Sequence, residues 1–308
     1  MWLSTSTNLF GSDQGRPYRT TMDESIRVCG EAGYRYLDAN FCGQCRRGRP
    51  VAAMTEDNWA EHAAHWRRIG DEMGVQFKQA HAFFSISGPV TMDTFPGGEF
   101  GEEMMRRSVL AAQIMGVEWM VVHPVCVVAD GRLDDDAAYR YNLAYFRRWH
   151  KFWRAHGIGM AIENMFNGAN HPNTWGNIDL LIRLVDELNE PDIGVCLDTG
   201  HAWITGYKPA DCVRRIGARL RATHIAENHG QGKDEHVAPF MGTIDWAETV
   251  RALREINYGH DFSFEVQNLT GCFPKAVQPE LIRFSRRLGE YLLSDALMAD
   301  AQRLAAEG

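Results

Sequence analysis

Residues 194–207 read GVCLDTGHAWITGY, an apolar run followed abruptly by an acid and an imidazole. The run has the composition of a short buried strand, which Asp198 ends. Gly200 lets the chain turn at once, so that His201 can point into the same cavity as Asp198. The stretch therefore predicts a core strand that delivers two polar side chains where it ends.

The same pattern repeats along the chain, because short β-rich runs alternate with longer amphipathic segments. The predicted strands are residues 2–8, 34–39, 75–82, 117–123, 158–164, 193–198, 221–226 and 261–266. The predicted helices include residues 57–74, 102–116, 134–157, 174–189 and 243–256. Three of these helices end at Gly74, Gly116 or Gly157, as left-handed C-caps require.

Eight strands that alternate with helices, without a linker between them, favour a single domain over residues 1–308. The simplest architecture is an α/β fold, a single (β/α)8 TIM barrel with a C-terminal helical tail at about residues 293–308. A doubly wound open sheet is the alternative. No GxGxxG motif follows the first strand, which argues against a dinucleotide-binding sheet.

Composition narrows the functional class. The 40 acidic residues outnumber the 32 basic ones, which gives a net charge of −8 and makes nucleic acid an unfavoured partner. We expect no signal peptide and no membrane span, hence a cytoplasmic protein. Seven scattered cysteines fit reduced thiols. We interpret the single CxxC pair, Cys42 and Cys45, as loop cysteines, with a metal or redox site as the alternative.

Ionisable side chains mark the C-terminal ends of the third to eighth predicted strands, where barrel enzymes carry their chemistry. They are His81, His123, Glu163, Asp198, His201, His224 and Glu265, and Asp234 and His236 follow in the loop after the seventh strand. Any one of them could be an ordinary core or surface residue. Carboxylates crowded in a barrel mouth resist desolvation, so the whole set predicts a bound cation.

Several of these stretches resemble the xylose-isomerase-like barrel family, which includes sugar-phosphate isomerases and epimerases, hydroxypyruvate isomerase, inosose dehydratase and endonuclease IV. The matching runs are RRSVLAAQIMGVEWMVVHP (106–124), AIEN (161–164), GVCLDTGH (194–201), THIA (223–226), DEH (234–236), GTIDW (242–246) and SFEV (263–266). The resemblance covers most of residues 75–270 and implies a metal-dependent enzyme on a barrel.

The resemblance also assigns roles. The epimerase-type metal ligands fall on Glu163, Asp198, His224 and Glu265, which would hold one divalent ion. Three carboxylates and one histidine suit Mn²⁺ or Mg²⁺, and nearby histidines favour Zn²⁺ as the alternative. His201 matches a substrate-contacting histidine. The extra zinc ligands of endonuclease IV fall on His81, His123, Asp234 and His236.

The sequence departs from both groups of relatives. Epimerases often carry a glutamate where this chain has Ala169, and many carry an arginine where it has Gly230. Endonuclease IV is expected to have Asn-Asp-Ser where residues 226–228 read Ala-Glu-Asn. These differences leave the substrate undetermined.

The leading hypothesis is a metal-dependent isomerase or epimerase of a sugar, sugar phosphate or polyol, acting through an enediolate. Glu163 and Glu265 would exchange protons beside a carbonyl, and His201 would stabilise the enediolate oxygen. A dehydratase or a C-glycoside-cleaving lyase would use the same deprotonation. The alternatives are a zinc phosphodiesterase resembling endonuclease IV and a barrel that keeps its metal without catalysis.

Aromatic residues suggest contacts with a small carbohydrate substrate and with a second subunit. Phe41, Trp175 and Trp203 follow strand ends, where their rings could stack on a sugar or pack in the core. Trp149 and Trp153 lie on one predicted helix, and we expect them to be exposed and to promote self-association.

Overall fold

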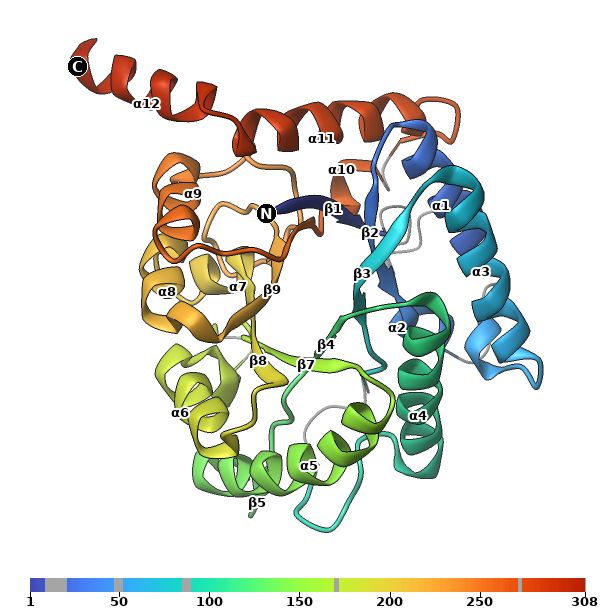
Figure 1. Cartoon of the computed structure of the whole chain (residues 1–308). Helices are drawn as coiled ribbons and strands as arrows, with labels where there is room; N and C mark the ends of the chain where they lie inside the picture. Colours follow the sequence, from blue (N-terminus) through green and yellow to red (C-terminus); the bar gives the residue numbers. More distant parts are fainter. Residues whose placement is uncertain (9–20, 47–51, 85–89, 169–171, 271–272, 308) are drawn as a thin grey trace.

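The computed structural model describes residues 1–8, 21–46, 52–84, 90–168, 172–270 and 273–307. Eight parallel strands form a closed barrel in the order β1-β10-β9-β8-β7-β4-β3-β2 (Figure 1). Their bounds are β1 Trp2–Ser6, β2 Tyr36–Asn40, β3 Gln76–His81, β4 Trp119–Val122, β7 Gly159–Glu163, β8 Ile193–Asp198, β9 Leu220–Ile225 and β10 Asp261–Phe264. The barrel prediction is confirmed, and each strand overlaps its predicted run. A short hairpin, β5 Val128–Ala129 with β6 Arg132–Leu133, lies outside the barrel.

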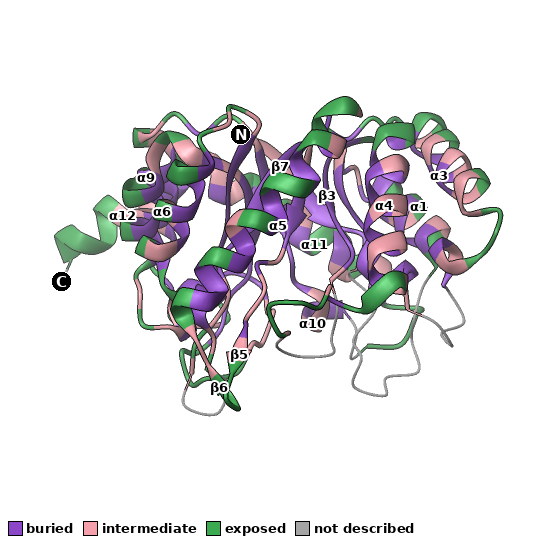
Figure 2. Cartoon of the chain, turned by 90° about the horizontal axis from the view of Figure 1, so that it is seen from below, coloured by how far each residue is buried: buried purple, intermediate pink, exposed green. Residues whose placement is uncertain are grey.

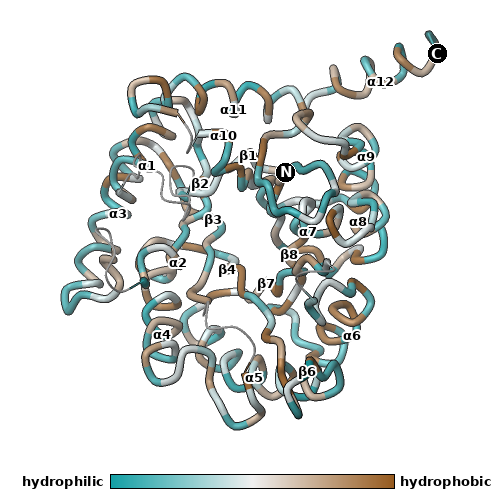
Figure 3. Tube along the Cα trace, turned by 180° about the vertical axis from the view of Figure 1, so that it is seen from behind, coloured by the Kyte–Doolittle hydropathy of each residue, from teal (hydrophilic) through white to brown (hydrophobic). Residues whose placement is uncertain are grey.

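Helices surround the barrel and bury their apolar sides against it (Figure 2). The longer ones are α1 Met22–Glu31, α3 Trp59–Met73, α4 Gly98–Met115, α5 Asp135–Ala155, α6 Ile178–Leu188, α8 Pro209–Ile216, α9 Trp246–Glu255, α11 Gln278–Leu293 and α12 Ala296–Glu307. Of three short ones, α2 Phe41–Gln44 and α7 Thr199–Ile204 directly follow β2 and β8, and α10 Gln267–Thr270 begins shortly after β10. The expected tail corresponds to α12, which projects beyond the barrel next to α9 and α11 (Figures 1 and 3).

Local side-chain chemistry explains where the helices begin and end. Asp134 caps α5 by accepting a hydrogen bond from the backbone of Ala137 at 2.8 Å. The predicted helix at residues 174–189 starts later than expected, because the side chain of Asn177 accepts hydrogen bonds from the backbone of Asp179 and Leu180. Gly74 and Gly116 adopt the left-handed conformation that was predicted for their C-caps.

The barrel interior is lined by small residues just below the site. Val121, Ala161, Cys196 and Ala222, from β4, β7, β8 and β9, form one buried cluster. Side chains two residues apart on a strand point to the same face. The next inward-facing position on each of these four strands is therefore His123, Glu163, Asp198 or His224. Because side chains alternate between the two faces of a strand, these four side chains all point into the barrel mouth.

Two expectations are wrong because the side chains concerned are buried. Trp149 and Trp153 are only 7% and 0% exposed, since both lie on the barrel-facing side of α5. They cannot form the surface for self-association. Cys42 and Cys45 are buried at helix α2 rather than in an open loop. Neither belongs to a group of potential metal ligands among the described residues.

None of the described helices is both long enough and apolar enough to cross a lipid bilayer.

Candidate metal centre

Four side chains from neighbouring strands meet at the C-terminal mouth of the barrel. Glu163 ends β7, Asp198 ends β8, His224 lies in β9, and Glu265 directly follows β10. One potential ligand atom from each lies within 4.8 Å of all the others. All four residues are buried, with Glu265 the most exposed at 8%. The structure therefore brings together the residues that the sequence assigned to one divalent ion.

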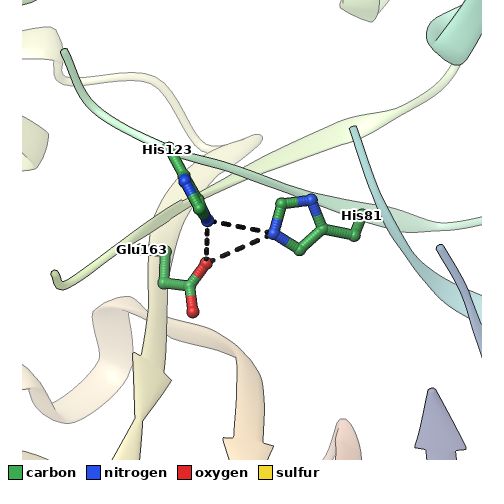
Figure 4. A group of neighbouring side chains, drawn as sticks. All are labelled: His81, His123 and Glu163. Carbon is green, nitrogen blue, oxygen red and sulfur yellow. Dashed lines mark hydrogen bonds and ion pairs between the residues drawn. The ribbon is translucent and has the colours of Figure 1, made fainter. Parts of the chain in front are cut away.

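Two further groups of potential ligands flank these four residues. His81 and His123 approach Glu163, whose Oε2 lies 3.5 Å and 3.0 Å from their Nε2 atoms (Figure 4). On the other side, His236 Nε2 lies 2.6 Å and His201 Nε2 lies 3.4 Å from Asp234 Oδ2. Ligand atoms within each flanking group also lie within 4.8 Å of one another. The structure thus brings all the predicted extra ligands to the same mouth.

Backbone carbonyls fix the orientation of three histidine rings. Nδ1 of His81 lies 2.8 Å from the carbonyl oxygen of Ala82, and Nδ1 of His201 lies 2.9 Å from that of Asn164. Nδ1 of His236 lies 3.0 Å from the carbonyl oxygen of Glu265. A carbonyl oxygen can only accept a hydrogen bond, so each ring must donate through its Nδ1–H group. Each Nε2 then faces the cavity, in the arrangement that proteins use to orient metal-binding histidines.

Burial and charge shift the acidity of the core group in opposite directions. Burial raises the pKa of the Glu163 carboxyl, but the positive charges of His224 and His123 outweigh it and hold that pKa well below its usual range. Burial raises the pKa of Asp198 to about 6, and the charge of Glu163 adds to this effect. Burial alone would lower the pKa of His224, but neighbouring acidic groups raise it well above its ordinary value. The raised pKa of His224 favours a positively charged imidazole beside these acids, whereas burial lowers the pKa of His123.

The donor set fits a divalent cation. Glu163 Oε2 and Asp198 Oδ2 are buried, and within the described ranges neither accepts a hydrogen bond of good geometry, although His123 Nε2 lies 3.0 Å from Glu163 Oε2. Buried carboxylate oxygens without partners are costly unless a cation or proton compensates them. Three carboxylates and one imidazole are ligand types that Mn²⁺, Mg²⁺ and Zn²⁺ accept. The fold and this donor set define a (β/α)8 barrel with a candidate metal centre.

Asp38 belongs to the site, although the sequence analysis did not include it. It lies in the middle of β2, and its Oδ2 accepts a hydrogen bond from Gln79 Nε2 at 2.7 Å. The same oxygen lies 3.2 Å from His224 Nε2. Asp38 is next to last in its predicted strand, residues 34–39, as Glu265 is in residues 261–266, but candidate ligands were assigned only on the third to eighth strands. An acid inside the apolar run YLDAN was the available signal.

Asn164 is a second residue that the sequence analysis did not assign. Its Oδ1 accepts a hydrogen bond from the backbone of Asp198 at 2.8 Å, and its Nδ2 donates to the carbonyl of Asp198 at 3.1 Å. Asn164 also holds His201 through its own carbonyl group. It therefore fixes the end of β8 against β7 and orients two site residues at once.

A buried glutamate anchors the loop that carries Asp234 and His236. Glu227 Oε1 accepts hydrogen bonds from the backbone of Thr243 and Ile244, both at 3.1 Å. Its Oε2 accepts one from Trp246 Nε1 at 2.6 Å. These bonds close the loop between β9 and α9.

The three aromatic residues predicted to stack on substrate have different environments. Phe41 and Trp175 are fully buried in the hydrophobic core, and Trp175 Nε1 donates to the carbonyl of Val125 at 2.9 Å. Burial of these two rings favours the alternative that they pack in the core. Trp203 is partly exposed and donates to Thr243 Oγ1 at 3.0 Å.

Two other rings adjoin the candidate ligands. Phe84 stacks on His123 with centroids 4.2 Å apart, and Phe166 lies 5.4 Å from His201. Ala169, where epimerases often have a glutamate, lies outside the described residues.

The comparisons with known proteins agree with this fold. The family model for the xylose isomerase-like TIM barrel matches residues 26–288, so the chain belongs to this family, as predicted. An uncharacterised protein of Sinorhizobium fredii is 27% identical over 222 residues, which are 65% of this chain and 69% of that protein.

Two relatives with described activities match shorter regions. A D-psicose 3-epimerase of Enterocloster bolteae is 32% identical over 101 residues, 33% of this chain and 30% of the enzyme. A probable endonuclease 4 of Mycobacterium leprae is 29% identical over 160 residues, 49% of this chain and 59% of that protein. The chain therefore matches less than two thirds of either one. Both are enzymes, which supports the expectation of an enzyme.

Solved structures show the same architecture over nearly the whole chain. A D-psicose 3-epimerase determined in the presence of D-fructose has a TM-score of 0.74 at 14% identity, covering 95% of this chain and 99% of that one. The IOLI protein with a bound zinc atom has a TM-score of 0.71 at 17% identity, covering 96% and 99%. At these identities the likeness establishes the fold.

Proposed function

We propose that the protein is a divalent-metal-dependent enzyme that isomerises or epimerises a small carbohydrate by moving a proton next to a carbonyl. The observation that carries the proposal is the placement of two glutamates around one donor set. Glu163 and Glu265 come from β7 and β10, which are separated in the barrel by β8 and β9. Carboxylates that approach a shared centre from separate strands can reach two sides of a bound substrate.

In this proposal, the side chains have separate roles in metal binding and proton transfer. Glu163, Asp198, His224 and Glu265 would hold the ion, with Mn²⁺ or Mg²⁺ favoured by the three carboxylates and Zn²⁺ by the flanking histidines. When bound, the ion would supply a Lewis acid and a template for a carbonyl and its neighbouring hydroxyl. One glutamate would remove the proton from the carbon beside the carbonyl. The other would return a proton to the neighbouring carbon or to the opposite face.

His201 is the candidate for stabilising the enediolate oxygen. Burial alone would lower its pKa, but the charges of Asp198 and Asp234 raise it well above the ordinary value. The ring therefore carries a proton on Nε2, while Nδ1 stays on the carbonyl of Asn164. Such a fixed donor is suited to a developing negative charge. Trp203, Phe84 and Phe166 are candidates for substrate contacts near this position.

Solvent-deuterium exchange tests the proposal, with ketoses, inososes and sugar acids as the probes. We expect Glu163→Gln and Glu265→Gln each to lower exchange by roughly 10²- to 10⁴-fold, because each loses an acid–base group. Glu118→Gln is the matched control, since Glu118 pairs with Lys78 just before β4, away from the mouth. Full turnover in both site variants would refute the mechanism.

A zinc phosphodiesterase is the second candidate, because a specific observation favours it. The flanking groups, His81 with His123 and Asp234 with His236, offer ligands beyond those that one ion needs. Elemental analysis of the purified protein separates the two: one ion per chain supports carbohydrate chemistry, and three zinc ions support the phosphodiesterase. Cleavage of a duplex that contains an abasic site would reverse our ranking.

A further inference from the structure

Helix α11 carries two stripes of mainly apolar or small side chains, and the structure buries one of them fully and the other only in part. The buried stripe consists of Gln278, Ile282, Ser285, Gly289 and Leu292. The second stripe lies one residue earlier in the sequence and consists of Val277, at the N-cap, Leu281, Phe284, Leu288 and Tyr291. One residue corresponds to about 100° around a helix. The second stripe therefore lies beside the buried one and is partly open to solvent.

Exposed apolar side chains gather around this second stripe. Across the described ranges, eight large apolar side chains are 37% to 63% exposed. Four of these eight lie on or next to α11, namely Phe240, Phe273, Val277 and Phe284, and Met241 follows Phe240 in the sequence. Scattered exposed apolar residues are ordinary, but a contiguous group marks an interaction surface.

The patch extends over both ends of the helix. At the C-terminal end, the rings of Phe240 and Tyr291 lie 6.1 Å apart. At the N-terminal end, Gln278 Nε2 donates to the carbonyl of Phe273 at 3.0 Å and holds that residue near the first turn. The surface therefore runs the length of α11, about 21 Å from Val277 to Tyr291 at 1.5 Å per residue.

The spacing of residues in the second stripe indicates that a helix packs against it. From Val277 to Tyr291, the residues follow one another at intervals of four, three, four and three. This is the heptad spacing with which one helix packs along another. A helix that lies alongside α11 would cover the whole stripe, whereas a small ligand would cover only part of it.

The charges that border the stripe identify the partner as a second copy of this chain. Glu280 and Arg287 are exposed on its solvent side, one heptad apart. Glu280 pairs with Arg283 of its own helix, and Arg287 has no ion pair within the described part of the chain. In an antiparallel pair of α11 helices, Glu280 of each copy can face Arg287 of the other. Such a surface is complementary to itself, as a two-fold axis requires.

The same charges select one register. With Glu280 opposite Arg287, Val277 of one copy packs across from Leu288 of the other, and Leu281 packs across from Phe284. A register shifted by one heptad would instead place Arg287 opposite Arg287. Like charges across such a contact disfavour it.

We propose that α11 forms a two-fold symmetric homodimer by pairing antiparallel with α11 of a second copy. Tyr291 and the adjacent Phe240 of each copy then approach Phe273 of the other, which covers both ends of the patch. This interface replaces the surface that Trp149 and Trp153 were expected to form.

Sedimentation equilibrium of the full chain tests the proposal. We expect the wild type to be a dimer and Phe284→Glu to dimerise at least about 100-fold more weakly, since two buried phenyl rings are replaced by charges. Ile114→Glu, a matched change of an exposed apolar residue on α4, leaves the dimer intact. A monomeric wild type, or a Phe284→Glu protein as dimeric as Ile114→Glu, would overturn the proposal.

Reversing the charges of Glu280 and Arg287 tests the register of the helix pair. Recovery in the double variant would show that the single variants were not simply misfolded. Glu280→Arg and Arg287→Glu alone each place like charges opposite one another twice, and we expect about tenfold weaker dimerisation. The double variant restores two opposite-charge pairs and should recover the wild-type dimer. Failure of the double variant to recover would contradict the antiparallel pairing.

Discussion

Asp261 offers a quantitative test of the barrel interior. Its side chain is 2% exposed at the start of β10, and its Oδ2 has no hydrogen-bond partner among the described residues. Burial, reinforced by the charge of Asp38, raises the pKa of Asp261 from 3.8 to about 8. The folded state therefore favours the protonated carboxyl. Its contribution to stability is fully present below pH 3.8 and is lost as the pH rises through about 8.

The size of the effect follows from the two pKa values. Between them, each pH unit costs the folded state about 1.4 kcal/mol relative to the unfolded state. The penalty is then about 2 kcal/mol at pH 5 and about 5 kcal/mol at pH 8. Asp261→Asn removes the ionisation and keeps the shape of the side chain. Its stability relative to the wild type should therefore increase by about 3 to 4 kcal/mol between pH 5 and pH 8.

Urea unfolding at the two pH values measures this difference. Asp57→Asn is the matched control, because Asp57 is exposed and the same substitution there changes no buried group. Comparing the variants at each pH cancels the titration of all other groups. A relative stability of Asp261→Asn that is the same at pH 5 and pH 8 would show that Asp261 is not held neutral in the folded protein.

Two further substitutions separate packing from site chemistry. Trp175→Ala should lower the free energy of unfolding by about 3 to 5 kcal/mol, because the ring is fully buried. Thermal unfolding measures this loss of stability. An unchanged stability would refute the core role of Trp175. Asp38→Asn should weaken metal binding about 10- to 100-fold, because Asp38 Oδ2 lies 3.2 Å from His224 Nε2 and orients a candidate ligand. Competition with a chelating dye measures the affinity. Asp261→Asn is the control, and equal affinities in both variants would rule out this role for Asp38.

Much of the fold and of the donor set could be predicted from the sequence. Strand and helix periodicity, helix-capping residues and left-handed glycines are local properties, so the barrel and most of its elements followed from them. Glu163, Asp198, His224 and Glu265 were among the candidates because each lies at or near the end of a strand, and the family resemblance then singled them out as ligands. In a parallel barrel all strand ends share one rim.

Other features depended on contacts between distant segments. The contact between Asp38 and His224 joins residues 186 positions apart, and no local pattern encodes it. Trp149 and Trp175 have the same chemistry whether a neighbouring helix covers them or solvent does, so only packing revealed their burial. The α11 stripe is likewise visible in the sequence as a heptad repeat. Only the tertiary structure shows which side the barrel leaves open, because burial depends on what packs against a helix rather than on the helix itself.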